Sequence, residues 1–113
     1  MNQQNEFGIY PEAYKWIMRA FNMFPEIDEV LIFGSRAKGD FKPGSDVDLA
    51  IKGNDLEYNY TEKVRNLLQE GLYTPYFFDV VDYNKITNAA LKEHIDRVGK
   101  LFYRQQVNGA MTG

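Results

Sequence analysis

The stretch FGSRAKGDFKPGSDVDLAI, residues 33–51, decides the fold of this chain. Its last part, SDVDLAIK at residues 45–52, alternates with a period of two, which is typical of a strand with one buried face. The alternation sends Val47, Leu49 and Ile51 to the apolar face. Asp46 and Asp48 therefore share the other face of the same strand.

Two carboxylates on one strand face repel each other unless a cation lies between them. An isolated D-x-D pattern usually marks only a solvated strand face, but the neighbouring GSRAKG, residues 34–39, favours a metal site here. No histidine or cysteine stands nearby, and hard oxygen ligands select Mg²⁺ or Mn²⁺ over zinc. Since Mg²⁺ commonly combines one or two carboxylates with substrate phosphates, the pattern predicts a phosphate-bearing ligand.

The GSRAKG segment can supply the phosphate side of such a site. Gly34 lets the backbone come close to a ligand, Ser35 offers a hydroxyl, and the next residues can begin a short helix with exposed N–H groups. The segment is not a P-loop, because Asp40 and Phe41 stand where that motif requires Lys and Ser or Thr. An ordinary strand-to-helix turn with Ser35 as its N-cap remains the alternative.

The rest of the chain alternates between helical and strand patterns. Apolar spacing predicts helices over about 11–24, from Tyr60 to Gly71, and over 88–98. Short apolar runs predict strands at residues 28–34 and 75–83, and KLFYR at 100–104 forms a further short segment. We therefore predict a single α+β domain over residues 1–104, with a mixed β-sheet packed against helices, and a flexible C-terminal tail at 105–113.

Composition excludes several classes of protein. The 113 residues fit one domain, and a net charge of −3 with a pI near 5.1 argues against direct, sequence-independent nucleic-acid binding. The absence of cysteine excludes disulfides and thiolate metal sites. No apolar stretch approaches the ~20 residues of a membrane span, so we expect a cytoplasmic protein with no membrane association.

The combined motif resembles a known family. Gly34-Ser35, ten intervening residues and Asp46-Val47-Asp48 reproduce the signature of the DNA polymerase beta-like nucleotidyltransferase superfamily. The short chain resembles its minimal nucleotidyltransferase branch, the antitoxin-type proteins often paired with HEPN-domain toxins. The resemblance implies the nucleotidyltransferase fold and a third carboxylate on a neighbouring strand. Asp79 fits that position; Asp82, three residues later on the opposite strand face, is the competing choice.

The resemblance also implies a role for each candidate residue. Asp46 and Asp48 would hold two Mg²⁺ ions, and Asp79 would hold the metal nearest the attacking hydroxyl or accept its proton. The β- and γ-phosphates of ATP would lie against Gly34 and Ser35. Arg36 and Lys38 would neutralise phosphate charge.

By the same resemblance, the chain would transfer AMP from ATP to a tyrosine of a HEPN toxin and so act as the antitoxin of a toxin–antitoxin pair. Larger relatives carry a helical domain that completes the site, so here a partner protein would complete it, in a homo- or hetero-oligomer. Two alternatives remain open. One is a non-catalytic antitoxin that neutralises its partner by stoichiometric binding, and the other is transfer to a small molecule such as an aminoglycoside.

Overall fold

The computed structural model describes residues 4–71 and 74–106. Helices and strands follow one another along the chain, with one short 3₁₀ helix, η1. Their bounds are α1 Pro11–Asn22, β1 Ile27–Phe33, α2 Gly34–Lys38, β2 Val47–Gly53, α3 Tyr60–Gln69, β3 Phe78–Asp82, η1 Tyr83–Lys85, α4 Ala89–Val98 and β4 Lys100–Arg104.

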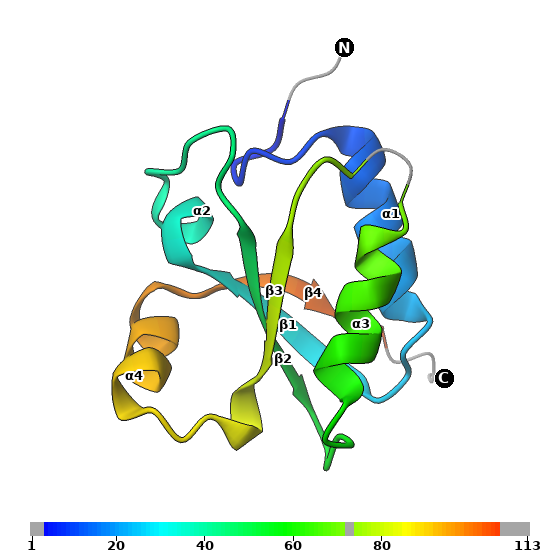
Figure 1. Ribbon diagram of the computed structural model, residues 1–113, viewed down its shortest axis with the longest axis vertical. Helices are drawn as coiled ribbons and strands as arrows, with labels where there is room; N and C mark the ends of the chain where they lie inside the picture. Colours follow the sequence, from blue (N-terminus) through cyan, green and yellow to red (C-terminus); the bar gives the residue numbers. More distant parts are fainter. Residues whose placement is uncertain (1–3, 72–73, 107–113) are drawn as a thin grey trace.

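The four strands form one sheet in the order β3-β2-β1-β4 (Figure 1). β1 pairs antiparallel with both β2 and β4, whereas β2 and β3 are parallel, so the sheet is mixed as predicted. A parallel pair requires a crossover, and α3 supplies it between β2 and β3. KLFYR, which the sequence marked only as a short segment, is the edge strand β4 beside β1.

The main core lies between the sheet and the helices α1 and α3 (Figure 1). Pro11 occupies the first turn of α1, where its missing N–H needs no partner. Each helix buries one stripe at helical spacing: Ala13, Ile17, Ala20 and Phe21 from α1, and Tyr60, Val64 and Leu68 from α3. On the sheet, the predicted apolar face of β2 contributes three fully buried side chains to this core: Val47, Leu49 and Ile51.

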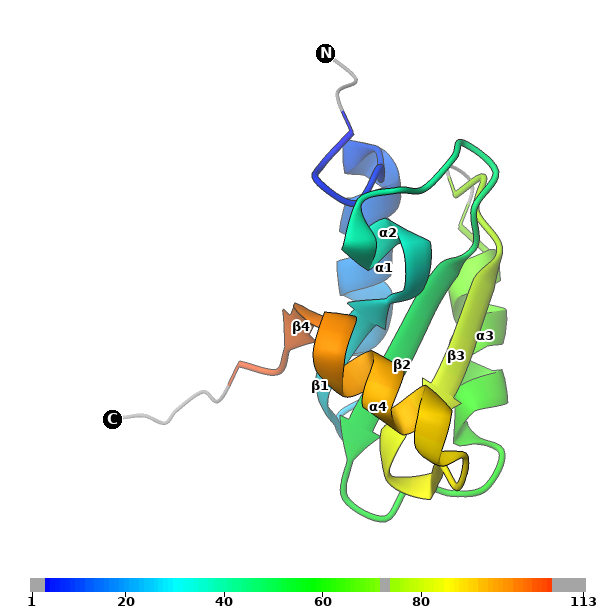
Figure 2. The same cartoon turned by 90° about the vertical axis from the view of Figure 1, so that its left-hand side faces the viewer.

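The opposite face of the sheet is covered by α4, which Figure 2 shows lying across the strands. Asn88 caps this helix by accepting a hydrogen bond from the backbone N–H of Leu91. Ile95 of α4 packs with Phe33 and Ala50 in a second, smaller apolar cluster. β2 is therefore buried on both faces at Ala50 but more open at its beginning, where Asp48 is only half-buried.

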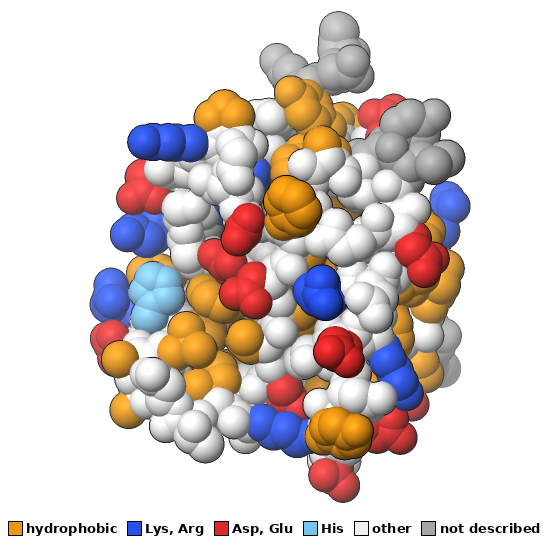
Figure 3. Space-filling model, in the orientation of Figure 1, with side chains coloured by type: hydrophobic (Ala, Val, Ile, Leu, Met, Phe, Trp, Pro, Cys, Tyr) orange, Lys and Arg blue, Asp and Glu red, His pale blue; other side chains and the backbone are white. Residues whose placement is uncertain are grey.

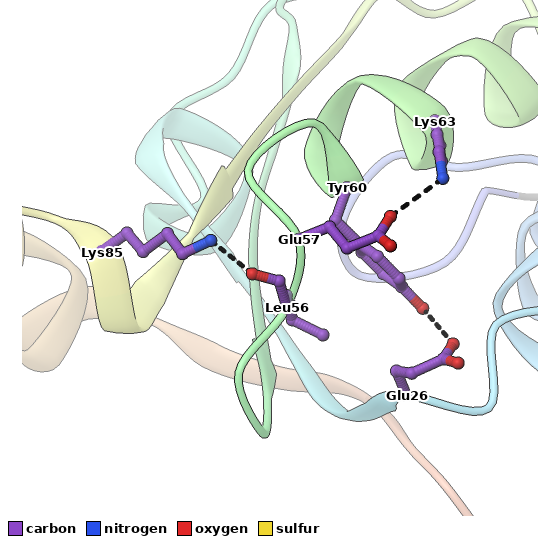
Figure 4. A network of polar contacts seen from close by, with 6 residues as sticks. All are labelled: Glu26, Leu56, Glu57, Tyr60, Lys63 and Lys85. Carbon is purple, nitrogen blue, oxygen red and sulfur yellow. Dashed lines mark hydrogen bonds and ion pairs between the residues drawn. The ribbon is translucent and has the colours of Figure 1, made fainter.

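A polar network ties the chain at the end of the sheet far from Asp48 (Figure 4). The Tyr60 hydroxyl donates to Glu26 Oε1 at 2.8 Å, and Lys63 Nζ donates to Glu57 Oε1 at 3.1 Å. Lys85 Nζ donates to the carbonyl of Leu56. Burial and the bond to Glu26 raise the pKa of Tyr60, so its hydroxyl stays protonated. These contacts join the turn before β1, the loop after β2, α3 and η1, and have a structural role.

The predicted α+β fold with its mixed sheet is confirmed. Gln105, the first residue of the predicted tail, donates through Nε2 to the carbonyls of Pro25 and Ile27, at 2.7 and 2.9 Å. Residues 107–113 of that tail lie outside the described residues. Within 4–71 and 74–106, every helix is too short or too polar to cross a bilayer.

Candidate active site

The strand register brings two of the predicted carboxylates together. Asp48 on β2 is the direct partner of Asp79 on β3, and on its other side it faces Phe33, the last residue of β1. Neighbouring strands lie about 4.8 Å apart, so the two aspartates are side by side. Asp46 immediately precedes β2, two residues from Asp48 and on the same face. Figure 3 shows a group of acidic side chains on this part of the surface.

Among these three carboxylates, the pKa of Asp48 is shifted by burial and by its acidic neighbours. Burial raises the pKa of its carboxyl from an ordinary 3.8 to about 6, with further increases from the nearby charges of Asp79 and Asp46. The Arg36 guanidinium opposes the rise but does not cancel it. The surroundings of Asp48 therefore favour its neutral form over its ionised form. A bound cation would compensate the negative charge and favour the ionised form again.

We predict that Asp48→Asn stabilises the protein in metal-free buffer. Because the folded pKa is raised, Asp48 binds its proton more tightly in the folded state, so wild-type stability falls as the pH rises from about 4 through 6. Solvent screening of this half-exposed group limits the loss to about 1 kcal/mol. Urea denaturation should show the variant more stable at pH 7.5 and nearly equal at pH 4.

The control is Asp28→Asn, on an exposed position of β1, whose effect on stability should stay within about 0.5 kcal/mol. An Asp48→Asn variant that is less stable than wild type at pH 7.5 would contradict the proposed repulsion between Asp48 and its neighbours Asp46 and Asp79.

Gly34 provides the space that Asp48 occupies. Its φ is +73°, a left-handed conformation that favours glycine. A Cβ built there would lie 2.2 Å from Asp48 Oδ2, so the Asp48 carboxylate lies directly over the Gly34 backbone. Ser35 follows at the start of α2, half-buried, and its carbonyl accepts hydrogen bonds from the N–H groups of Gly39 and Asp40. The Gly-Ser pair therefore adjoins the carboxylates.

Gly34→Ala should lower the free energy of unfolding by about 2 kcal/mol or more, because it adds both backbone strain and a collision with Asp48. Gly39 separates the two effects: its φ is +88° but a Cβ there meets nothing within 4 Å, so Gly39→Ala should cost only about 1 kcal/mol. Urea denaturation of both variants tests this order. Equal losses would show that Asp48 does not press on Gly34.

Arg36 is held in the interior and not at the phosphate position that the resemblance implied. It is 2% exposed. Its Nε and Nη2 donate to the Ser45 carbonyl at 3.1 and 2.8 Å, and its Nη1 donates to the carbonyls of Phe7 and Gly8 at 2.8 and 3.2 Å. The guanidinium also lies over the rings of Phe41 and Tyr76, 5.1 and 4.9 Å from their centroids.

Arg36 thus joins the N-terminal segment to the loop before β2, and it fixes Ser45, the residue that precedes Asp46. With four hydrogen bonds to carbonyls and two aromatic rings against its guanidinium, it acts as a positioning residue. Lys38, the other predicted cation, is exposed and lies 3.7 Å from Asp40. Its ammonium is free to move to an anionic ligand.

The geometry separates the two candidates for the third carboxylate. Asp82 pairs with Ile51, three positions along the ladder from the Asp48–Asp79 pair, about 10 Å away. It accepts from the Asn84 N–H and lies 3.8 Å from Lys85 Nζ. The structure places Asp79, and not Asp82, beside Asp48.

The donor set suits a hard divalent cation, since all three candidate ligands are carboxylates. In the described part of the chain no three acidic, histidine or cysteine side chains stand close enough as they are to hold a metal ion. Asp48 Oδ2 lies over Gly34, and Asp46 and Asp79 are exposed. The residues fit Mg²⁺ by their chemistry, and they lie on one face at one end of the sheet.

Sequence reasoning did not single out Phe77, which is 74% exposed next to this group. The sequence feature that could have identified it is the pair Phe77-Phe78 before Asp79. Because side chains alternate along a strand, one of these two rings must face away from the core.

Comparison with known proteins supports the resemblance. Residues 15–108 match the family model described as polymerase beta, nucleotidyltransferase. A search of curated proteins finds no match.

Several solved structures share the fold. A toxin–antitoxin crystallised with AMP-PNP has a TM-score of 0.67 and 22% identity, over 82% of this chain and 74% of that one. The toxin–antitoxin MntA-HepT gives 0.60 and 19%, over 82% and 71%. A tri-AMPylated HEPN toxin of Shewanella oneidensis in complex with its MNT antitoxin gives 0.61 and 19%, also over 82% and 71%. Because the family model spans most of the sequence, this chain belongs to the polymerase beta nucleotidyltransferase family.

Proposed function

We propose that this protein is a Mg²⁺-dependent nucleotidyltransferase that moves AMP from ATP to a tyrosine of a HEPN-type toxin, and that it acts in the cytoplasm as the toxin's antitoxin. The observation that carries the proposal is the pairing of Asp48 with Asp79 beside Asp46 and Gly34. Two related structures support the nucleotide and the acceptor, one with AMP-PNP and one with a tri-AMPylated HEPN toxin.

In the proposed reaction the tyrosine oxygen attacks the α-phosphorus of ATP. The bond from this phosphorus to the bridging oxygen breaks, and pyrophosphate leaves. Asp79, exposed at the start of β3, accepts the phenolic proton or orients the hydroxyl. Asp46 and Asp48 would hold Mg²⁺, which when bound neutralises charge on the phosphoryl oxygens.

The phosphates of ATP would lie against the Gly34-Ser35 turn, where the absence of a side chain at Gly34 permits close approach and the Ser35 hydroxyl can donate. Lys38 would add positive charge at the outer phosphates. Arg36 contributes indirectly, by holding the loop that carries Asp46. The carboxylates and the Gly34-Ser35 turn all lie at one end of the sheet.

The test is to incubate the protein with Mg²⁺, ATP and the HEPN-type protein encoded beside it, and to weigh that protein by mass spectrometry. We expect one or more AMP additions on tyrosine when the nucleotidyltransferase is present at one-twentieth of the toxin concentration. The double variant Asp46→Asn/Asp48→Asn should add none while still binding the toxin.

Neutralisation without a mass change, and only at equal concentrations, would defeat the enzymatic proposal in favour of an occluding antitoxin. Rapid AMP transfer to an aminoglycoside without any protein partner would instead support a small-molecule enzyme.

A further inference from the structure

Phe77 exposes an apolar ring at the edge of the carboxylate group. It is 74% exposed, whereas the adjacent Phe78 is 4% exposed and belongs to the main core. The Phe77 carbonyl accepts the Val47 N–H at 2.8 Å, so the backbone here already follows the ladder between β3 and β2. Alternation then places the Phe77 ring on the face that carries Asp79.

Among the described residues, the Phe77 ring belongs to neither of the two apolar clusters. A phenyl side chain left in water forgoes the favourable free energy of burying its ring. Other strongly exposed aromatic positions in the described residues, such as Tyr58 at 91%, carry a hydroxyl that water can solvate. Figure 3 shows exposed hydrophobic atoms directly beside the acidic group. An apolar ring next to charged catalytic groups suits contact with a ligand that is itself aromatic.

The order of the strands indicates which part of the reaction the ring faces. The Gly34-Ser35 turn, where pyrophosphate would leave, follows β1. Asp48 lies on β2, with Asp46 immediately before that strand. On the far side Asp79 lies on β3, with Phe77 immediately before it. In displacement at phosphorus the attacking and leaving oxygens lie roughly in line on opposite sides. The attacking hydroxyl must therefore arrive from the β3 side, where Phe77 is.

We propose that Phe77 forms the acceptor subsite: its ring packs against the ring of the acceptor tyrosine as the phenolic oxygen approaches the α-phosphorus. This inference rests on the proposed function and specifies its acceptor side. An uncharged phenol also suits this edge better than an anionic acceptor, because Asp79 and Asp46 would repel the latter. The nucleoside is joined to the α-phosphorus through a third oxygen, its 5′ oxygen, which lies off the line of attack.

The experiment measures AMP transfer to the HEPN-type partner by wild type, Phe77→Ala and Phe77→Tyr, varying the partner and ATP concentrations separately. Truncation to Ala removes both the contact between the two rings and the area that they bury, so we expect kcat/KM for the partner to fall about tenfold in Phe77→Ala. The ATP concentration for half-maximal rate should change less than about twofold, and Phe77→Tyr should restore most of the rate. Tyr58→Ala, at an exposed aromatic position outside the site, is the matched control and should match wild type.

A raised ATP requirement with an unchanged partner dependence would overturn the proposal and identify Phe77 as a nucleobase contact. Equal kinetics for wild type and Phe77→Ala would overturn it as well, while leaving the proposed function intact. Absence of transfer by wild type would instead defeat the proposed function, and the acceptor subsite with it. Urea denaturation of Phe77→Ala should give wild-type stability, which assigns any kinetic loss to the site.

Discussion

Asp79→Asn will lower the rate of AMP transfer by about 10³-fold or more and leave ATP affinity within about threefold of wild type. The substitution keeps the shape of the side chain but removes the charge that accepts or orients the acceptor proton. That loss is felt mainly in the transition state and little in nucleotide binding. Because Asp79 is exposed and faces Asp48, its neutralisation also relieves repulsion and should not destabilise the fold.

The measurement is the rate of AMP addition to the HEPN-type partner, with ATP affinity from calorimetric titration. Asp82→Asn is the matched control, since Asp82 lies on the same strand but bonds with Asn84 and Lys85 instead of facing Asp48. It should retain transfer. If the Asp82 variant lost activity and the Asp79 variant kept it, the third carboxylate would be Asp82 and the site would extend along the strand.

The second large effect is on stability: Arg36→Met should lower the free energy of unfolding by about 3–5 kcal/mol. The side chain supplies four hydrogen bonds to three carbonyls, those of Ser45, Phe7 and Gly8. Met fills much of the space but removes the Arg36 donors from the Ser45 and Phe7 carbonyls, whereas the Gly8 carbonyl still accepts from the Tyr76 hydroxyl. The contact with the rings of Phe41 and Tyr76 also loses its charge. Arg36→Lys keeps the charge but not the planar fork, so its loss should be smaller.

Urea denaturation measures these losses, and Lys38→Met, two residues later at an exposed position of α2, should stay within about 0.5 kcal/mol of wild type. A stable Arg36→Met protein that had lost only ATP affinity would contradict the interior role and return Arg36 to the phosphate contacts that the family resemblance implies.

Local patterns in the sequence determined much of this structure. The period of two in SDVDLAIK was enough to place Asp46 and Asp48 on one face and Val47, Leu49 and Ile51 in the core. Helical spacing and Pro11 located α1, and comparable spacing located α3 and α4. These features follow from the sequence because side-chain direction along a strand or helix depends only on near neighbours.

The pairing of distant segments was decided by the tertiary structure. The parallel register of β2 and β3 sets Asp79, and not Asp82, beside Asp48, since a shift along the ladder would exchange them without changing either strand's own pattern. The fold also buries Arg36 among carbonyls that come from residues before and after it in the sequence, and it leaves the Phe77 side chain exposed to solvent. A charged residue is buried, or an apolar one exposed, according to which partners the fold brings to it. Those partners lie too far along the chain for local periodicity to identify. They are Phe7 and Ser45 for Arg36, and Val47 of β2 for the Phe77 backbone.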